Sequence, residues 1–155
     1  MHWLMTNKHE CVVPNTTNVF YWEADLISVT KAGLAHEFEI KISLSDYKAD
    51  AKKVNKHYRL KNTEHGPAYF WYVTYGFEID PPSYAGWMKI VEIQGVPRVQ
   101  MVKPAPRLHP NKITDKQRFQ ILRSLSWQLA NLSELLWLKL PLSEKSKEAD
   151  NNLLS

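Results

Sequence analysis

The chain has 155 residues, of which 44% are apolar and 12% are aromatic, and a formal net charge of +4. This is the length of one ordinary domain, and the composition is too apolar for an intrinsically disordered chain. No apolar run approaches the roughly 18 residues that a membrane-spanning helix needs, so we expect no membrane partner. Residues 1–7 lack the basic leader and apolar stretch of a secretory signal, and we therefore expect a cytoplasmic protein.

Several common kinds of site are excluded by the absence of their residues. The single cysteine, Cys11, excludes an internal disulfide and a cysteine-based zinc site. The chain also has no Gly-x-Ser-x-Gly, Walker, Gly-x-Gly-x-x-Gly or His-Glu-x-x-His motif, which argues against the hydrolases, nucleotide-binding proteins and zinc proteases that carry them. The mildly basic charge permits a polyanionic partner without requiring one.

A β-hairpin is the first predicted element. Residues 19–29 and 34–43 have the composition of strands, and the turn between them ends at Gly33, which can take the positive φ that such turns need. Successive side chains of a strand alternate between its two faces. The second strand therefore has one apolar face, formed by Phe38, Ile40 and Ile42, and one charged face, formed by Glu37, Glu39 and Lys41.

One helix over residues 43–60 is predicted to follow. Ser43 and Asp46 have the Ser-x-x-acid form of a capping box. Apolar side chains recur at helical spacing on one side of this helix, at Tyr47, Ala51, Val54 and Tyr58. Polar side chains recur on the other side, at Asp46, Asp50, Lys53 and His57. We expect the polar row to face solvent.

Three more strands complete the predicted sheet. They are residues 68–74, whose dense aromatic run indicates a central strand, and residues 86–93 and 96–102, which pair across a turn. Residues 103–111 read as an extended, proline-rich connector. We therefore expect an α/β fold with a mixed sheet flanked by helices, in a single domain over residues 1–141 with a flexible polar tail at 142–155.

The last predicted helix runs from Thr114 to about Leu140 and is ended by Pro141. Leucines follow it at a 3-4-3-4 spacing, at positions 122, 125, 129, 132 and 136, and further apolar side chains lie on its other faces. This is more apolar surface than one core contact needs. Two alternatives stay open: the helix packs wholly on its own sheet, or it pairs with a second copy in a homodimer.

Acidic residues and a lysine on the hairpin carry the candidate chemistry. The chain contains three acid-x-Lys triplets, and two of them fall on the predicted helix, where residues two apart do not face each other. Glu39 and Lys41 lie on a strand, where a period of two aims both side chains at one place. The adjacent strand brings Asp25 as a second carboxylate. Two carboxylates and a backbone carbonyl suffice for a hard cation such as Mg²⁺. The alternative is a solvent-facing charged ladder of a one-sided sheet.

A longer pattern surrounds these residues. Residues 22–33, WEADLISVTKAG, are followed by residues 37–50, EFEIKISLSDYKAD, and then by the aromatic strand. This order of an Asp, a Glu-x-Lys, an S-x-x-D-Y-x-x-D helix start and an aromatic strand resembles the PD-(D/E)XK nuclease superfamily. The similarity covers roughly residues 12–110 and is greatest to its small phage-encoded and bacterial DNA-repair-type members. In a phage-encoded member the compartment is the host cytoplasm.

The resemblance implies a restriction-endonuclease-like core and a Mg²⁺-dependent deoxyribonuclease, with Mn²⁺ as a substitute. It implies Asp25 and Glu39 as metal ligands, the carbonyl of Ile40 as a third ligand, and Lys41 as the ammonium that faces the water or the phosphate. The residue before Asp25 is Ala24 where the superfamily's pattern has proline. Whether Glu10, Glu23 or Glu37 assists the site stays open.

DNA is the expected partner. Basic residues that could contact phosphates are Lys48, Lys52, Lys53, Lys56, Arg59 and Arg107. Because 155 residues leave no room for a separate specificity domain, we expect the substrate to be a DNA structure such as a branch, flap, end or damaged duplex. The alternative is a catalytically silent PD-(D/E)XK-like module that binds DNA or a replication or repair protein, since fold alone does not certify activity.

Overall fold

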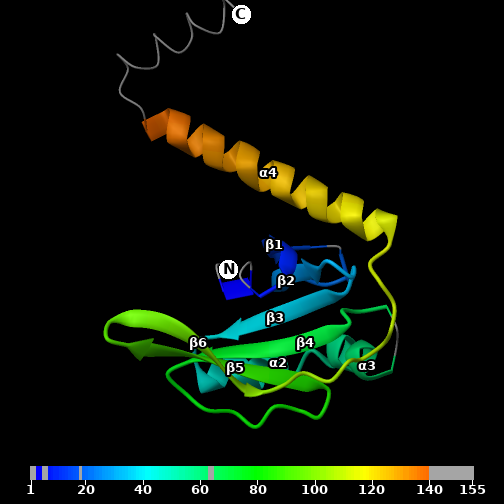
Figure 1. The fold of residues 1–155 in the computed structure, drawn as a ribbon, viewed down its shortest axis with the longest axis vertical. Helices are drawn as coiled ribbons and strands as arrows, with labels where there is room; N and C mark the ends of the chain where they lie inside the picture. The colour runs from blue at the N-terminus through cyan, green and yellow to red at the C-terminus, as the bar shows by residue number, and fades with distance from the viewer. Residues whose placement is uncertain (1–2, 5–6, 18, 63–64, 140–155) are drawn as a thin grey trace, which may run out of the picture. The chain divides into compact units, whose positions relative to one another are not determined.

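A mixed sheet of six strands, adjacent in the order of the chain, forms the centre of the fold (Figure 1). The computed structural model describes residues 3–4, 7–17, 19–62 and 65–139. The strands are β1 (His9–Thr16), β2 (Ala24–Thr30), β3 (Ala35–Lys41), β4 (Tyr69–Tyr75), β5 (Ala85–Ile93) and β6 (Val96–Lys103). The helices are α2 (Leu44–Asp50), α3 (Val54–Asn62) and α4 (Asp115–Lys139).

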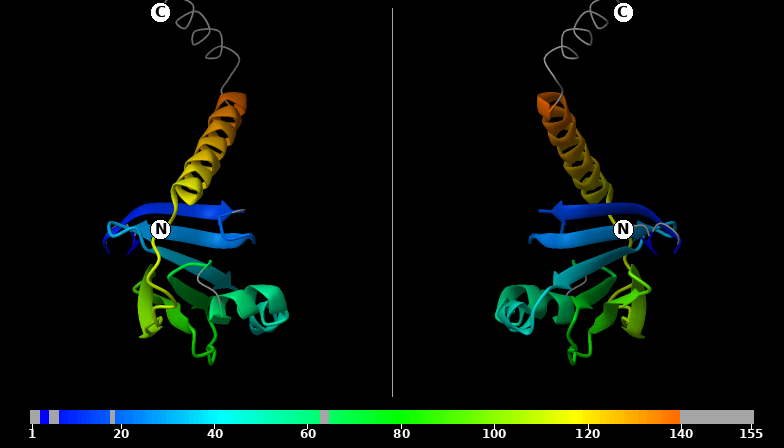
Figure 2. Two further views of the ribbon diagram at one scale, coloured as in Figure 1. Left: turned by 90° about the vertical axis from the view of Figure 1, so that its right-hand side faces the viewer. Right: turned by 90° about the vertical axis from the view of Figure 1, so that its left-hand side faces the viewer.

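The sheet is antiparallel at both ends and parallel in the middle. Strands β1, β2 and β3 form an antiparallel meander, β3, β4 and β5 run parallel, and β6 returns antiparallel to β5. Helices α2 and α3 form the crossover from β3 to β4 and lie next to each other on one face of the sheet (Figure 2). The expected α/β fold with a mixed sheet and flanking helices is confirmed.

The predicted hairpin is present as β2 and β3, and its turn is closed as expected. Gly33 has a φ of +80°, its N–H donates to the Thr30 carbonyl at 2.8 Å, and the Thr30 N–H donates to the Leu34 carbonyl at 3.0 Å. The first predicted strand is wrong in its N-terminal half. Residues 19–22 are not a strand, and Tyr21 has a φ of +68°, which breaks an extended conformation.

Strand β1 was not predicted. It carries Pro14 and Asn15, which are poor strand formers, so its composition gives little strand signal. A proline is tolerated there because β1 lies at the edge of the sheet, where one side of the strand needs no ladder hydrogen bonds.

The segment predicted as one helix forms two. Ser43 caps α2 as expected, since its Oγ accepts from the Asp46 N–H at 3.1 Å. Residues 51–53 then interrupt the helix, and this break changes which side chains of α3 face the sheet. Tyr47 packs against the core as expected, but the apolar positions predicted in α3 are exposed, with 71% of Val54 and 63% of Tyr58 accessible. Asp50 and His57, expected in solvent, are buried instead.

Two apolar clusters cover the two faces of the sheet. One contains Leu26, Phe38, Trp71 and Met88, and the other contains Leu60, Phe70, Tyr72 and Ala85. Strand β4 supplies both clusters alternately, as a central strand covered on both faces should. Ile40 and Ile42, expected in the core with Phe38, are exposed because they lie at and beyond the end of β3.

The C-terminal part of the sheet and the first turn of α4 also agree with what the sequence predicts. Strands β5 and β6 pair across Gln94 and Gly95, whose positive φ angles suit a tight hairpin turn. Residues 104–114 form the expected connector without helix or strand. Thr114 caps α4, because its Oγ1 accepts from the Gln117 N–H at 3.2 Å and the Gln117 side chain accepts from the Thr114 N–H at 2.8 Å.

The described chain divides into two compact units, Met1–Ile121 and a second unit that begins at Leu122 and contains the rest of α4. Ile121 is the buried residue of α4, and four of the five leucines in the predicted stripe are exposed. The homodimer stays a prediction.

No helix among the described residues is both long and apolar enough to cross a bilayer. Pro141 and the predicted tail at 142–155 lie outside the described residues.

Candidate active site

The charged face of β3 lies inside the protein. Glu37, Glu39 and Lys41 are 0%, 2% and 4% exposed, and they face the side of the sheet that α2 and α3 cover. This rules out the solvent-facing ladder. Burial of three ionised side chains is costly unless each finds a partner of opposite charge, so the neighbours of these groups define the site.

Asp25 lies beside Glu39, at the end of the β2–β3 ladder. Leu26 pairs with Phe38, and the next step of the same register places Asp25 opposite Glu39 on the same face. The Ile40 N–H donates to Asp25 Oδ2 at 2.7 Å, so the Asp25 side chain takes the place of a ladder bond. Burial raises the pKa of the Asp25 carboxyl. The hydrogen bond from Ile40 lowers this pKa and the charge of Glu39 raises it further, so that the pKa is raised overall.

Lys41 is surrounded by carboxylates. Its Nζ donates to Glu39 Oε2 at 3.0 Å and lies 3.5 Å from Asp50 Oδ1 and 3.8 Å from Asp46 Oδ1. Burial alone lowers the pKa of Lys41, but Glu39 and the two aspartates outweigh it, so its pKa is raised. Lys41 therefore stays an ammonium at neutral pH. The structure brings together Asp25, Glu39 and Lys41, the three residues that the sequence singled out.

Lys56 is part of this cluster and was assigned otherwise from the sequence. It was grouped with the phosphate-binding lysines, but it is 5% exposed and its Nζ binds Glu39 Oε1 and, at 2.7 Å, Glu37 Oε1. Burial lowers the pKa of Lys56, and the charges of Glu37 and Glu39 raise it by more. One signal could have placed it: Lys56 precedes the buried Leu60 by four residues, which is one face of a helix.

Glu37 has a second partner from the segment before β2. The Trp22 Nε1–H donates to both of its carboxylate oxygens at 2.9 Å. Burial raises the pKa of Glu37, while the charge of Lys56 and its hydrogen bond lower it. Glu37 is thus attached to the cluster through Lys56. Glu10 lies exposed on the edge strand β1, and Glu23 lies exposed just before β2.

Asp50, at the end of α2, joins the cluster to the second apolar core. The Tyr72 hydroxyl donates to Asp50 Oδ2 at 2.8 Å, and His57 Nε2 lies 2.8 Å from the Asp50 carbonyl and 3.2 Å from Oδ2. The Tyr84 hydroxyl is 2.9 Å from His57 Nδ1. Burial by itself raises the pKa of Asp50, but the bonds from His57 and Tyr72 and the lysine charges lower it far below its usual range.

This shift predicts an acid-sensitive fold. Because the pKa of Asp50 is lowered in the folded state, its contribution to stability is present above the unfolded value of about 4 and is lost as pH falls below it. Asp50→Asn should therefore be less stable than the wild type at pH 7 and lose less stability on acidification. Urea unfolding at several pH values down to pH 3 measures this; parallel losses in the two proteins would contradict it.

The cluster as a whole carries an excess of negative charge. Five carboxylates, those of Asp25, Glu37, Glu39, Asp46 and Asp50, outnumber the three ammonium groups of Lys41, Lys53 and Lys56. Excess negative charge in a poorly solvated site favours a bound cation.

The donor types fit a hard divalent cation, with one condition. The carboxylates of Asp25 and Glu39 and the carbonyl of Ile40, near the end of β3, would supply oxygen ligands, which Mg²⁺ prefers. Both Glu39 oxygens, however, are engaged by Lys41 and Lys56. Among the described residues, no group of three or more His, Cys, Asp or Glu side chains is arranged to hold a metal ion. A cation at Asp25 and Glu39 would have to compete with Lys41 or Lys56 for a Glu39 oxygen.

The other predicted phosphate contacts fall into separate places. Lys48, Lys52, Lys53 and Arg59 are exposed on α2, α3 and the residues between them. Lys53 Nζ lies 3.1 Å from Asp50 Oδ1, which ties it to the cluster. Arg107 is far along the chain in the connector, where its guanidinium donates to the carbonyls of His109 at 3.2 Å and Pro110 at 3.1 Å.

Comparison with known proteins defines the fold class and leaves the activity open. No known family model matches the chain, and no curated protein matches it. A solved structure shares the α/β fold with its mixed sheet. It is described as the SPO1766 protein of unknown function from Silicibacter pomeroyi; it is 16% identical, with a TM-score of 0.58, over 86% of this chain and 82% of that one. At this identity the likeness concerns the fold alone.

Proposed function

We propose that the protein is a metal-dependent deoxyribonuclease of the PD-(D/E)XK type with a restriction-endonuclease-like core. The observation that carries the proposal is the position of Asp25 opposite Glu39, with Lys41 on the same buried face. Asp25, Glu39 and the carbonyl of Ile40 would hold Mg²⁺, with Mn²⁺ as a substitute. Lys41 supplies an ammonium beside this donor set, since its Nζ lies 3.0 Å from Glu39 Oε2.

The residues divide the work of phosphodiester hydrolysis. When bound, the metal ion would acidify a water and stabilise charge on the phosphate. Lys41, whose carboxylate neighbours keep it protonated, would orient the water or neutralise the negative charge that develops on the phosphate. Water is consumed and one P–O ester bond breaks. The buried network around Asp50 and His57 would hold Lys41 and α2 in place.

The proposed substrate is a DNA structure, such as a branch, flap, end or damaged duplex. Exposed Lys48, Lys52, Lys53 and Arg59 lie on α2, on α3 and on the residues between them, and would contact phosphates. Arg107 is a further phosphate contact of this proposal.

The second candidate is a catalytically silent module that binds DNA or a replication or repair protein. One observation favours it: Lys56 already supplies a positive charge to Glu39 and Glu37, where a metal ion would otherwise bind. In that case the lysine replaces the ion as the counter-charge, and the buried cluster serves stability alone.

A panel of branched, flapped, nicked and linear DNAs, incubated with Mg²⁺, Mn²⁺ or a chelator, tests the proposal. We expect cleavage of at least one DNA in a divalent ion and none in chelator. Binding of Mn²⁺ to the protein alone, followed by its paramagnetic resonance signal, supplies a readout independent of cleavage. DNA binding without Mn²⁺ binding or cleavage would select the silent module.

A further inference from the structure

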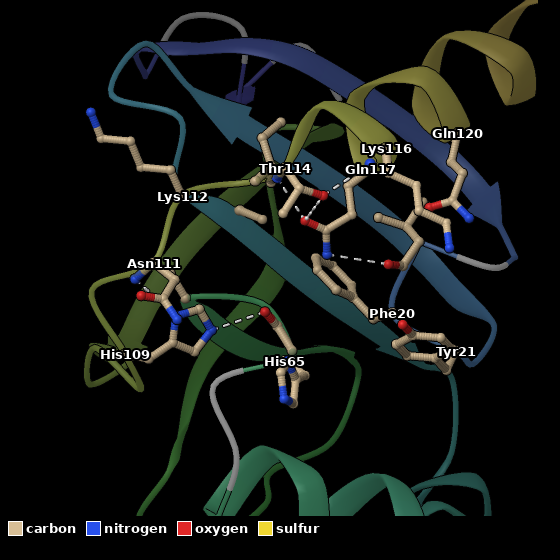
Figure 3. A pocket seen from close by; sticks show the side chains of 15 residues that line it. Phe20, Tyr21, His65, His109, Asn111, Lys112, Thr114, Lys116, Gln117 and Gln120 are labelled. Atoms are coloured by element: carbon tan, nitrogen blue, oxygen red, sulfur yellow. Dashed lines mark hydrogen bonds between the residues drawn. The ribbon is translucent and has the colours of Figure 1, made fainter.

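Three hollows adjoin one another around the segment before β2. The first, of about 620 Å³, lies between residues 19–21, the connector and the first turns of α4 (Figure 3). The second, of about 610 Å³, is lined by Tyr21, Trp22 and α3, and the third, of about 490 Å³, by Trp22, Glu23 and the start of α3. Tyr21 lines the first two and Trp22 the last two, so the three hollows are neighbours; together they are here called the basic groove.

The charge of the basic groove is strongly one-sided. Its exposed cations are Lys52, Lys53, Arg59, Lys112 and Lys116, and Glu23 is the carboxylate among the residues that line it. Lys53 is partly neutralised by Asp50, and Lys112 extends away from the first hollow in Figure 3, whereas Lys116 lies on the side of Tyr21. This distribution favours a polyanion over a neutral or cationic ligand.

Aromatic side chains alternate with these cations. Tyr21 is 74% exposed and Tyr58 63% exposed, and the Arg59 guanidinium lies 5.7 Å from the centre of the Tyr21 ring. Tyr21 also has a φ of +68°, a conformation that costs energy for a bulky side chain. The fold therefore retains a strained tyrosine whose ring gains little from burial, at the junction of the first two hollows.

The basic groove adjoins the candidate active site through Lys56. Lys56 lines the second and third hollows, and its Nζ binds Glu39. Glu23, at the same end, is two residues before Asp25. A polymer lying along the groove would therefore pass Lys56, whose Nζ binds one of the carboxylates proposed to hold the metal ion.

We propose that the basic groove binds a single-stranded segment of DNA and leads it to the candidate active site; the choice of DNA rests on the proposed function. Unpaired bases stack on exposed aromatic rings while cations contact the backbone, and this combination is typical of single-strand binding sites. A duplex has its bases already stacked, so exposed tyrosines would add nothing to its affinity. The proposal narrows the substrate to a flap, an open branch or a frayed end.

Tyr21→Gly is the sharpest test, because it separates binding from stability. Glycine removes the ring and tolerates a positive φ, so the variant should be at least as thermally stable as the wild type. Its affinity for labelled oligodeoxythymidylate, measured by fluorescence anisotropy in chelator, should fall about tenfold or more through the loss of a stacked base. Gln94→Gly is the matched control, since Gln94 has a φ of +54° in the β5–β6 turn and does not line the groove.

Charge variants test the path along the groove. Lys52→Gln/Lys116→Gln removes one cation near each end and should lower the salt dependence of single-strand binding by about 1.4 units of log–log slope, at about 0.7 per contact. Lys31→Gln/Arg98→Gln changes the net charge equally at exposed positions outside the groove and should leave the slope unchanged. A blunt duplex of equal length should bind more weakly than the DNA single strand, because its bases are already stacked, and an RNA oligonucleotide is measured beside it.

The outcomes separate this proposal from the proposed function. Wild-type affinity in Tyr21→Gly, equal slopes in both double variants, or tighter binding of duplex or RNA would overturn the groove, even if the protein cleaves DNA. Single-strand binding that depends on Tyr21 in a protein that cuts nothing would keep the groove and reject the nuclease.

Discussion

Asp25→Asn is expected to reduce metal-dependent DNA cleavage by about 1,000-fold, the equivalent of several kcal/mol of lost charge stabilisation, while the melting temperature hardly changes. Asparagine has the same size as aspartate, and its side-chain oxygen can still accept the hydrogen bond from Ile40. Asp25 is only half buried and has no ammonium within ion-pairing distance among the described residues, so removal of its charge leaves no buried group unpaired. Cleavage in Mg²⁺ and in Mn²⁺, together with thermal unfolding, measures both expectations.

Binding provides the control for Asp25→Asn. In chelator the wild-type carboxylate repels phosphate, so the variant should bind DNA as well as the wild type or better. Weak binding in chelator would show that Asp25 is structural, and unchanged cleavage in either metal would remove it from the site. Glu39→Gln and Lys41→Ala should also lose cleavage, but these variants do not separate activity from stability. Both remove a partner from a buried ion pair, so the structure leads us to expect a loss of stability as well.

The sequence predicted the elements whose signal is local. The Ser43 cap, the Gly33 turn and the alternating charged face of β3 each depend on a few adjacent residues, and all three are present. That Asp25 and Glu39 share a side was predictable in part, because it follows once the turn at residues 31–33 sets the register of the β2–β3 hairpin.

Tertiary contacts account for what sequence reasoning missed. The polar row on the predicted helix looked like a solvated face, since nothing local shows that Asp50 and His57 meet Tyr72 and Tyr84 from beyond the crossover. Lys56 was one lysine in a basic run, and its burial depends on two glutamates from β3. The break at residues 51–53 turned that side of α3 inward.

Lys56→Met is expected to destabilise the fold by about 3–5 kcal/mol at pH 8. Lys56 Nζ is the ammonium that binds both Glu37 and Glu39. Without Lys56, Glu39 still has its ion pair with Lys41, whereas Glu37 retains the hydrogen bond from Trp22 and no ion pair among the described residues. Met preserves the length and the apolar stem of the side chain, so the loss reports the charge. Lys48→Met, at an exposed position of α2, is the matched control and should stay within about 0.5 kcal/mol of the wild type.

The penalty should depend on pH with a defined sign. Burial raises the pKa of Glu37, and the charge of Lys56 lowers it, so Lys56→Met should raise the pKa of Glu37 further. A carboxyl whose pKa is raised in the folded state binds its proton more tightly there, and stability is lost as pH rises through that pKa. Lys56→Met should therefore lie closer in stability to the wild type at pH 5 than at pH 8.

A double variant tests whether the penalty acts through Glu37. Addition of Glu37→Gln removes the unpaired charge, and the introduced amide oxygen can still accept a hydrogen bond from Trp22. The double variant should therefore be about 1–3 kcal/mol more stable than the sum of the two single losses predicts. Urea unfolding of the four proteins at both pH values completes the cycle; additive losses, or a penalty that is the same at pH 5 and pH 8, would show that Lys56 does not stabilise the fold through Glu37.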